Sequence, residues 1–298
     1  MMDRYFKVAE HIFELSMPEA DSLWEAIGNY EPFRTEPTED PLFRLELRRV
    51  DSMAFPAKDP IYDEHPKRDD MPRAKVFRGE DGWAFTMSPG EGQPYSFLTR
   101  ASADFRSATL SIERQGMYAK FALDNSLMLL YSLCTAPLGT LAMHSSVIMH
   151  DGRGYMFLGV SGTGKSTHSR LWLENIPGCE LMNDDNPVVR IHDDGSAWVY
   201  GTPWSGKTPC YKDIAAPIGA VVQIKQAPYN SLRRQEVLEA YTSLLTSCSG
   251  MRFHAPTEDA MSKTQNSFLK GTTFYLMECL PDADAARVCH EGTTQTNK

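Results

Sequence analysis

A glycine-rich stretch near the middle of the chain has the residue types and the spacing of a phosphate-binding loop. It reads GVSGTGKST and matches the Walker A, or P-loop, pattern of Gly, four residues, Gly, Lys and Ser. In such a loop, successive backbone N–H groups point into one concavity, and the helix that follows adds its positive N-terminal end. The residues expected to bind the nucleotide are Gly159, Val160, Ser161, Gly162, Thr163, Gly164, Lys165, Ser166 and Thr167.

Two side chains at the end of this loop have distinct expected tasks. Lys165 would reach the β- and γ-phosphates of ATP and so take part in catalysis, and the hydroxyl of Ser166 would coordinate Mg²⁺. A chance Gly-rich turn is the alternative interpretation. The context favours a phosphate loop, because the preceding run GYMFLGV has the length of a strand and the following KSTHSRLWLEN has helical spacing.

A pair of carboxylates follows at the distance that one helix and one returning strand would cover. Asp184 and Asp185 end the short apolar stretch ELMNDD, 19 and 20 residues after Lys165. A carboxylate at the end of that strand would face the loop, where it can hold Mg²⁺ directly or through water. The alternative is a plain acidic turn, since NDDNP is also good turn chemistry.

The elements that would position these residues fall into two regions. Short alternating runs such as FRLELRRV, GWAFTM and TLSIER indicate half-buried strands, and polar, Pro-rich connectors lie between them. We therefore expect an antiparallel, β-rich module over residues 1–119. Over residues 120–298, strands and helices alternate, which implies an α/β core. Helices are expected at DNSLMLLYSLC, after the loop, over about 233–248, and at DADAARVCH.

The composition argues against some classes of partner. With 39 acidic and 30 basic residues, the net charge of -9 does not suit nucleic acid or an anionic membrane surface. Residues 125–143 carry no charge, but Pro-Leu-Gly interrupts them, so we expect a buried helix and a turn; a membrane segment is the alternative. The N-terminus lacks the apolar core of a secretory signal, and the expected location is the cytoplasm.

Cysteine and histidine spacing offers no separate metal site. No two of the six cysteines are separated by the two to four residues of a zinc knuckle or a redox pair, so reduced thiols are expected. Histidines without metal-ligand spacing are His150, His168, His192, His254 and His290. Ser161 lies inside the loop and not in a nucleophile elbow, which gives hydrolase chemistry no support.

The loop and the aspartate pair together resemble the superfamily of HPr kinase/phosphorylase and phosphoenolpyruvate carboxykinase (ATP). His144 adds to the likeness to the HPr kinases, which place a histidine ahead of the loop strand; it lies 15 residues before Gly159. The resemblance covers roughly residues 120–225. It implies an α/β, P-loop kinase core with a mixed sheet, preceded here by the β-rich N-terminal module.

Carried over residue by residue, the resemblance implies that ATP and Mg²⁺ are bound. Lys165 and the loop would bind the triphosphate, and Ser166 and Asp185 would hold Mg²⁺. Asp184 would be the general base that takes the proton of the acceptor hydroxyl. His144 would lie beside the phosphates as a further catalytic residue, or it is a satisfied core histidine.

The segment after the aspartates departs from the HPr kinase pattern. Where those kinases carry a charged second signature, this chain has GTPWSGK, residues 201–207, so HPr as the acceptor is not supported. Trp204 would either lie on a flat substrate or pack inward. Lys207 would either bring positive charge to the transferring phosphoryl group or stay solvated in a hairpin turn.

These features predict an ATP- and Mg²⁺-dependent kinase that transfers the γ-phosphoryl group to a hydroxyl, either a serine of a protein or peptide or a small metabolite. The sequence does not choose between these acceptors. The alternative is a nucleotide-binding sensor or scaffold without transfer activity. The resemblance to HPr kinases is also compatible with a homo-oligomer.

Overall fold

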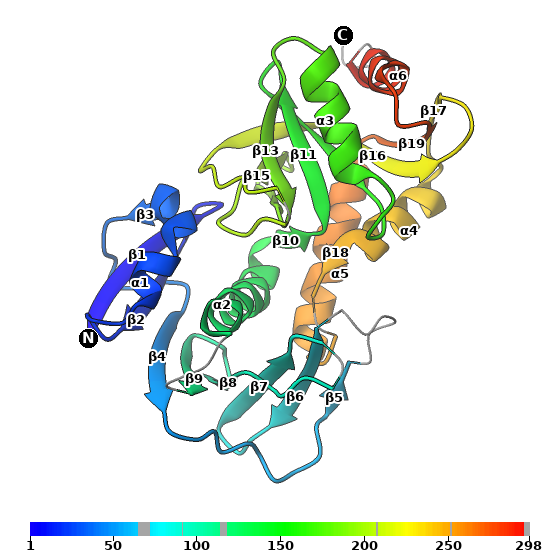
Figure 1. Cartoon of the computed structure of the whole chain (residues 1–298). Helices are drawn as coiled ribbons and strands as arrows, with labels where there is room; N and C mark the ends of the chain where they lie inside the picture. Colours follow the sequence, from blue (N-terminus) through cyan, green and yellow to red (C-terminus); the bar gives the residue numbers. More distant parts are fainter. Residues whose placement is uncertain (65–71, 91, 114–117, 207, 251, 295–298) are drawn as a thin grey trace. The chain divides into compact units, whose positions relative to one another are not determined.

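The computed structural model shows a mixed α/β fold (Figure 1). It describes residues 1–298 except 65–71, 91, 114–117, 207, 251 and 295–298. The chain divides into two compact units: residues 1–135 with 251–258, and residues 136–250 with 259–298. The boundary that we expected at 119/120 falls where α2 (Ala119–Thr135) begins, and this helix is grouped with the first unit.

The first unit is built on one sheet, in which the strands lie in the order β3-β1-β2-β4-β9-β8-β7-β6-β5. The strands are β1 (Met2–Val8), β2 (His11–Met17), β3 (Arg34–Thr35), β4 (Arg44–Val50), β5 (Tyr62–Asp63), β6 (Arg73–Arg78), β7 (Gly82–Ser88), β8 (Leu98–Ser102) and β9 (Ser107–Glu113). Most of these strand pairs are antiparallel, as expected, but β4 departs from the expectation because it runs parallel to both β2 and β9. The connection between β2 and β4 holds α1 (Leu23–Ala26) and η1 (Gly28–Phe33), which makes it long enough for a parallel crossover.

Strand periodicity accounts for the core of this unit. In β2, every second side chain is buried, and Phe13 stacks on Phe43 with ring centroids 5.1 Å apart. Helix α2 contributes ten buried residues, and Tyr131 donates its hydroxyl to the backbone oxygen of Val8 at 3.0 Å. No helix of the described chain is both long and apolar enough to cross a membrane. The uncharged residues 125–143 form the second half of α2, the 3-10 helix η2 (Ala136–Leu138) and strand β10 (Thr140–Met143).

The second unit is a mixed sheet that positions the candidate site. Its strands lie in the order β13-β11-β12-β16-β15-β14-β10-β18, with β19 paired to both β16 and β17. The strands are β10 (Thr140–Met143), β11 (Ser145–His150), β12 (Arg153–Leu158), β13 (Glu180–Asp185), β14 (Val188–Ile191), β15 (Ala197–Tyr200), β16 (Ala215–Gln226), β17 (Ser231–Arg234), β18 (Cys248–Ser249) and β19 (Phe274–Cys279). The strands β12, β16 and β19 are parallel to one another, so their carboxyl ends meet at one edge.

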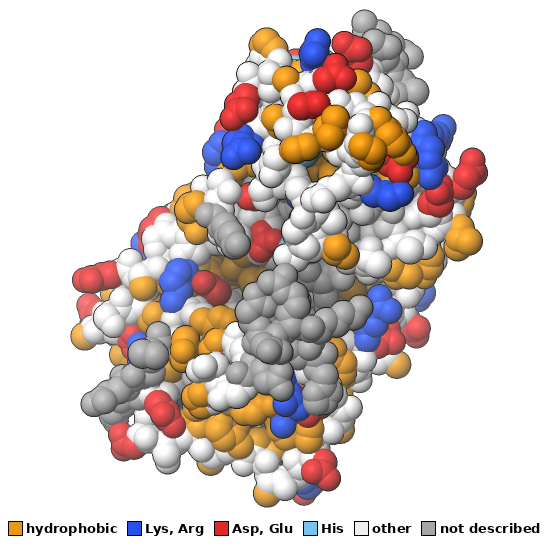
Figure 2. Space-filling model, turned by 45° about the vertical axis from the view of Figure 1, so that its right-hand side comes forward, with side chains coloured by type: hydrophobic (Ala, Val, Ile, Leu, Met, Phe, Trp, Pro, Cys, Tyr) orange, Lys and Arg blue, Asp and Glu red, His pale blue; other side chains and the backbone are white. Residues whose placement is uncertain are grey.

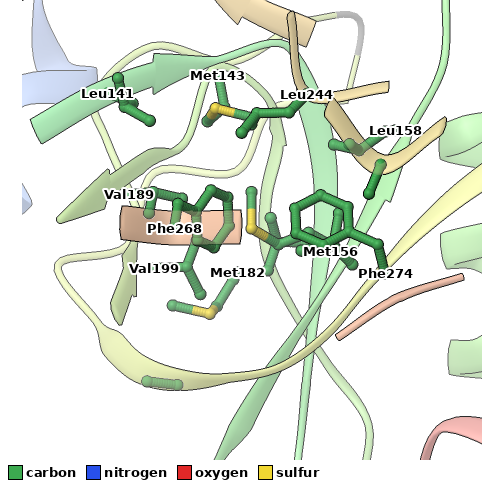
Figure 3. Close-up of a cluster of buried hydrophobic side chains, with 14 of the residues drawn as sticks. Leu141, Met143, Met156, Leu158, Met182, Val189, Val199, Leu244, Phe268 and Phe274 are labelled. Atoms are coloured by element: carbon green, nitrogen blue, oxygen red, sulfur yellow. The ribbon is translucent and has the colours of Figure 1, made fainter. Parts of the chain in front are cut away.

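Side chains of β12 are buried on both faces of this sheet, as its continuous apolar sequence predicts. Tyr155 and Phe157 pack with Trp172 of α3 (Lys165–Asn175) and with α6 (Ala283–Thr294). Met156 and Leu158 point into the opposite cluster, which contains Leu244 and Phe268 (Figure 3). The glycine-rich loop is thus held between a strand and a helix that are both fixed by packing.

The segment from residue 231 to 247 differs from our expectation of one helix over about 233–248. Residues 231–234 form strand β17, which pairs antiparallel with β19. Helix α4 (Val237–Ser247) begins only after Glu236, which forms a capping box with Glu239. The four residues of β17 lie opposite Tyr275–Glu278 of β19, and this strand pairing overrides the local helical pattern.

The charged side chains on the surface do not gather by sign on the face in view. Figure 2 shows Lys and Arg side chains interspersed with Asp and Glu, and no continuous basic stripe. All six cysteines are free thiols, as expected from their spacing. Burial raises the pKa of Cys279 to about 11, so this thiol stays protonated at neutral pH.

His150, at the end of β11, and His290, in α6, form a partly buried contact. Because of this contact we expect the stability of the fold to depend on pH. The Nε2 atoms of His150 and His290 lie 3.0 Å apart, so one ring must donate while the other accepts. Burial and the neighbouring His150 lower the pKa of His290, although Asp151 and Glu291 act in the opposite direction. The folded state therefore binds fewer protons than the unfolded chain, and its stability decreases as the pH falls below the ordinary histidine pKa of about 6.5.

We expect the melting temperature to fall between about pH 7 and about pH 5, and to fall less steeply in His290→Gln. The control His192→Gln leaves the histidine pair intact and should keep the wild-type pH dependence. Parallel curves for wild type and His290→Gln would contradict this assignment. Thermal unfolding followed by circular dichroism at several pH values measures the effect.

Candidate functional site

The loop between β12 and α3 has a backbone path that requires glycine. Gly159, Gly162 and Gly164 have φ angles of 150°, 88° and 103°, a region that other residues rarely adopt. Gly164 is also the residue that precedes α3, whose first turn is closed by the bond from the His168 N–H to the Gly164 oxygen at 2.8 Å. The backbone N–H groups at the start of α3 are therefore free for an anion.

Gly159 is the most constrained glycine of the loop. A Cβ atom at this position would overlap the Oγ1 atom of Thr163. We expect Gly159→Ala to force the loop into another path and to lower ATP affinity more than tenfold, with little change in circular dichroism. The control Gly271→Ala has ordinary backbone geometry and a nearest atom at 3.5 Å, so it should bind ATP like wild type. Equal affinity of the two variants, measured by calorimetric titration, would contradict this prediction.

Lys165 is the first residue of α3, and its side chain folds back over the loop to the Gly159 oxygen. It is only 8% exposed, and its Nζ atom lies 2.8 Å from the Gly159 oxygen and 2.8 Å from His144 Nε2. Burial lowers the pKa of Lys165, while the charges of Asp185 and Asp184 act in the opposite direction. The ammonium group thus lies at the loop with negative charge near it and little water around it.

His144 connects Lys165 to one member of the aspartate pair. Its Nδ1 atom lies 3.0 Å from Asp185 Oδ1. When Nδ1 donates to the carboxylate, Nε2 accepts from the ammonium group, so the three side chains form one hydrogen-bonded chain. Burial raises the pKa of Asp185, but the hydrogen bond and charge of His144, then Lys165 and Asn186, bring it below the ordinary aspartate value. Asp185 is therefore a carboxylate at neutral pH.

Asp184 makes a different contact, with the hydroxyl of the loop. Ser166 Oγ donates to Asp184 Oδ1 at 2.9 Å, and Asp184 is only 4% exposed. The structure thus brings Ser166 together with Asp184, and His144 together with Asp185. Side chains normally alternate along a strand, but Asp185 has a φ angle of 119° and the strand bends there. The bend allows the Asp184 and Asp185 side chains both to face the loop.

The segment from Gly201 to Gly206 closes against the aspartate pair. The Gly206 N–H and the Ser205 hydroxyl both donate to the Asp184 backbone oxygen, at 2.7 Å and 3.0 Å. A Cβ atom on Gly206 would lie 2.9 Å from the Asp185 Cβ atom, so only glycine fits here. Trp204 is 5% exposed and packs inward, and Lys207 lies outside the described residues.

Asn183 holds the end of β13 in place, and sequence reasoning did not distinguish it from its neighbours. It is fully buried, and its side-chain nitrogen donates to the Trp204 oxygen at 3.0 Å and to Thr202 Oγ1 at 3.2 Å. Its side-chain oxygen accepts the Asn186 N–H at 3.0 Å. One amide thus joins the end of β13 to the 201–206 segment and holds the turn that carries both aspartates.

The oxygen atoms at the site suit Mg²⁺. The Ser166 hydroxyl and the Asp184 carboxylate are hard ligands that already lie within hydrogen-bond distance of each other. Within the described residues, no three His, Cys, Asp or Glu side chains are placed to hold a metal ion by themselves. This arrangement fits an ion that takes one or two protein ligands and completes its coordination with phosphate and water.

Comparisons with known proteins give little beyond this geometry. No family model matches the chain, and no curated protein matches it. A solved structure of the HPr(Ser) kinase/phosphatase from Coxiella burnetii aligns with a TM-score of 0.30 and 10% identity. The alignment covers 53% of this chain and 99% of that one. At this level the likeness is distant, and the functional argument rests on the side chains.

Proposed function

We propose that this site binds ATP with Mg²⁺ and transfers the γ-phosphoryl group to a hydroxyl. The observation that carries the proposal is the placement of four kinds of group around one loop. A lysine, a histidine and a carboxylate form one hydrogen-bonded chain, Lys165–His144–Asp185, and a serine hydroxyl bonds the neighbouring carboxylate, Ser166–Asp184. Phosphoryl transfer needs positioning and charge stabilisation, and these are the groups that supply both.

Each group of the loop has a task in this reaction. The backbone N–H groups of residues 162–166 would bind the phosphates, and Lys165 would leave the Gly159 oxygen to reach the β- and γ-phosphates. Ser166 and Asp184 would hold Mg²⁺, which supplies charge neutralisation on the phosphate oxygens. Lys207, next to Gly206 in the chain, is a further candidate for a contact with the transferring group.

The hydrogen bonds support an exchange of roles within the aspartate pair, relative to those that the HPr kinase resemblance implies. Asp184 is engaged with Ser166, whereas Asp185 is engaged with His144. We therefore assign Asp185 as the general base that receives the proton of the acceptor hydroxyl, with His144 to orient it. Asp184 would be the metal ligand. A positioned base of this kind contributes about 10²- to 10⁴-fold to the rate.

A sensor that binds ATP without transferring phosphate is the second candidate function. The two functions differ in one experiment: incubation of the purified chain with γ-labelled ATP and Mg²⁺ in a lysate of its own host. A labelled protein or metabolite that is absent with Lys165→Met would support the kinase. Tight ATP binding with no transferred label in any fraction would contradict transfer and favour the sensor.

A further inference from the structure

Ser205 places a hydroxyl of the chain itself beside the aspartate pair. Its backbone forms an isolated antiparallel β-bridge with Asp185, and its Oγ atom lies 3.0 Å from the Asp184 backbone oxygen. The next residue, Gly206, packs so closely that a Cβ atom built on it would lie 3.1 Å from Asp185 Oδ2. A hydroxyl, which is the acceptor group of the proposed reaction, is therefore already present next to the proposed base.

The backbone on both sides of Ser205 is anchored. Before it, Trp204 is buried, and its backbone oxygen accepts a bond from the Asn183 side chain at 3.0 Å. After it, the Gly206 N–H donates to the Asp184 oxygen at 2.7 Å. Ser205 thus keeps only the rotation about its Cα–Cβ bond, which has three staggered positions. An acceptor fixed in this way loses little freedom when it reacts.

The Ser205 oxygen has lone pairs available for a bond to phosphorus. Two backbone oxygens lie within hydrogen-bond distance of Oγ, that of Asp184 at 3.0 Å and that of Thr208 at 2.6 Å, and both can only accept. Among the residues that the structure describes, no N–H or O–H group donates to Ser205 Oγ. A serine oxygen accepts through two lone pairs, so both remain free here. Ser205 is also only half-buried, so this oxygen is not enclosed in the core.

We propose that Ser205 is a phosphoryl acceptor within the same chain. The inference rests on the proposed function, because it names an acceptor for the γ-phosphoryl group of ATP. In this step, Ser205 Oγ forms a bond to the γ-phosphorus, and the bond from that phosphorus to the oxygen bridging the β-phosphate breaks. The electron pair of the broken bond leaves with ADP. The proton of the Ser205 hydroxyl passes to the Asp185 carboxylate.

The product of this step would limit the activity of the site. Phosphoserine carries a charge of about −1.5 to −2 at neutral pH, and beside two carboxylates it adds to the negative charge already there. The phosphate on Ser205 would also repel the phosphates of a second ATP molecule. We therefore expect the phosphorylated chain to bind ATP about tenfold more weakly than the unmodified chain.

The test uses the purified full chain with γ-labelled ATP and Mg²⁺ and no added acceptor. Peptide mapping by mass spectrometry should find the phosphoryl group on the peptide that contains Ser205. Because the acceptor and the base belong to one chain, the initial rate per chain should stay constant when the protein is diluted. A rate per chain that falls on dilution would show transfer between chains and would overturn transfer within one.

Variants of the same segment separate the hydroxyl from the fold around it. Ser205→Thr keeps a hydroxyl and should keep the label, whereas Ser205→Ala should lose it and still bind ATP. Thr208→Val is the matched control: Thr208 is exposed, and the variant keeps the backbone oxygen that lies near Ser205, so it should be labelled like wild type. Calorimetric titration after incubation with ATP should show the loss of affinity in wild type but not in Ser205→Ala.

The outcomes distinguish this inference from the proposed function. Label on another residue, or label that Ser205→Ala retains, would overturn Ser205 as the acceptor. Label on a component of the host lysate but never on the chain would do the same and leave the proposed function standing. Absence of label from the chain and from every lysate fraction would overturn both.

Discussion

Replacement of Lys165 with methionine is expected to lower the rate of the proposed phosphoryl transfer by orders of magnitude without destabilising the fold. The ammonium group lies at the loop, on the Gly159 oxygen, where the proposed triphosphate would bind. Removal of one such charge-stabilising donor typically lowers the rate about 10²- to 10³-fold. ATP affinity should also fall, by about tenfold or more, because the charge acts on the ground state too. Both quantities can be measured by calorimetry and by single-turnover assays with labelled ATP.

The free energy of unfolding of Lys165→Met should rise or stay unchanged, although its activity falls. Burial lowers the pKa of Lys165, which means that the fold holds this charge at a cost. Methionine has a similar shape and no charge, so exchange of a poorly solvated ammonium group for it is often neutral or stabilising. Lys212→Met is the control, since Lys212 also bonds a carboxylate and a backbone oxygen, Glu180 Oε1 at 2.7 Å and the Leu181 oxygen at 2.9 Å. Equal loss of activity in the two variants would contradict a special role for Lys165.

The local architecture of the site could be read from the sequence because its signals are local. The run GYMFLGV predicts β12, the glycines predict the turn, and the residues from Lys165 form α3 as expected. The distance from Lys165 to the aspartates allows one helix and one strand, and β13 ends at Asp185. A resemblance alone predicted His144 beside the phosphates; the structure shows its contacts with Lys165 and Asp185, and its catalytic role stays a prediction.

Features that depend on distant pairing could not be read in this way. Helix α5 (Ala255–Gly271) carries many polar residues and few apolar ones, so its sequence does not predict a core element, although Phe268 is fully buried. Strand β17 exists because β19 offers it an edge, and β4 is parallel because of the crossover before it. Asn183 bonds Thr202 and Trp204 of the 201–206 segment, and the sequence does not show that the end of β13 contacts this segment.

The two aspartates should respond differently to the same isosteric change. Asp184→Asn removes the carboxylate that faces Ser166, so the Mg²⁺ concentration needed for half-maximal activity should rise about tenfold or more. Asp185→Asn keeps a hydrogen-bond acceptor for His144 but cannot take a proton. Its turnover should therefore fall about 10²- to 10⁴-fold, with the Mg²⁺ requirement unchanged.

The pH profile gives an independent measure of the same assignment. The pKa of Asp185 lies below the ordinary aspartate value, because the contacts with His144, Lys165 and Asn186 outweigh the effect of burial. A base of this kind is charged at neutral pH, and the rate should decline when acid protonates it, below the ordinary aspartate value of about 3.9. Asp185→Asn should lose this acid limb and Asp184→Asn should keep it. The reverse result, with the metal effect in Asp185→Asn and the loss of the limb in Asp184→Asn, would restore the roles that the HPr kinase resemblance implies.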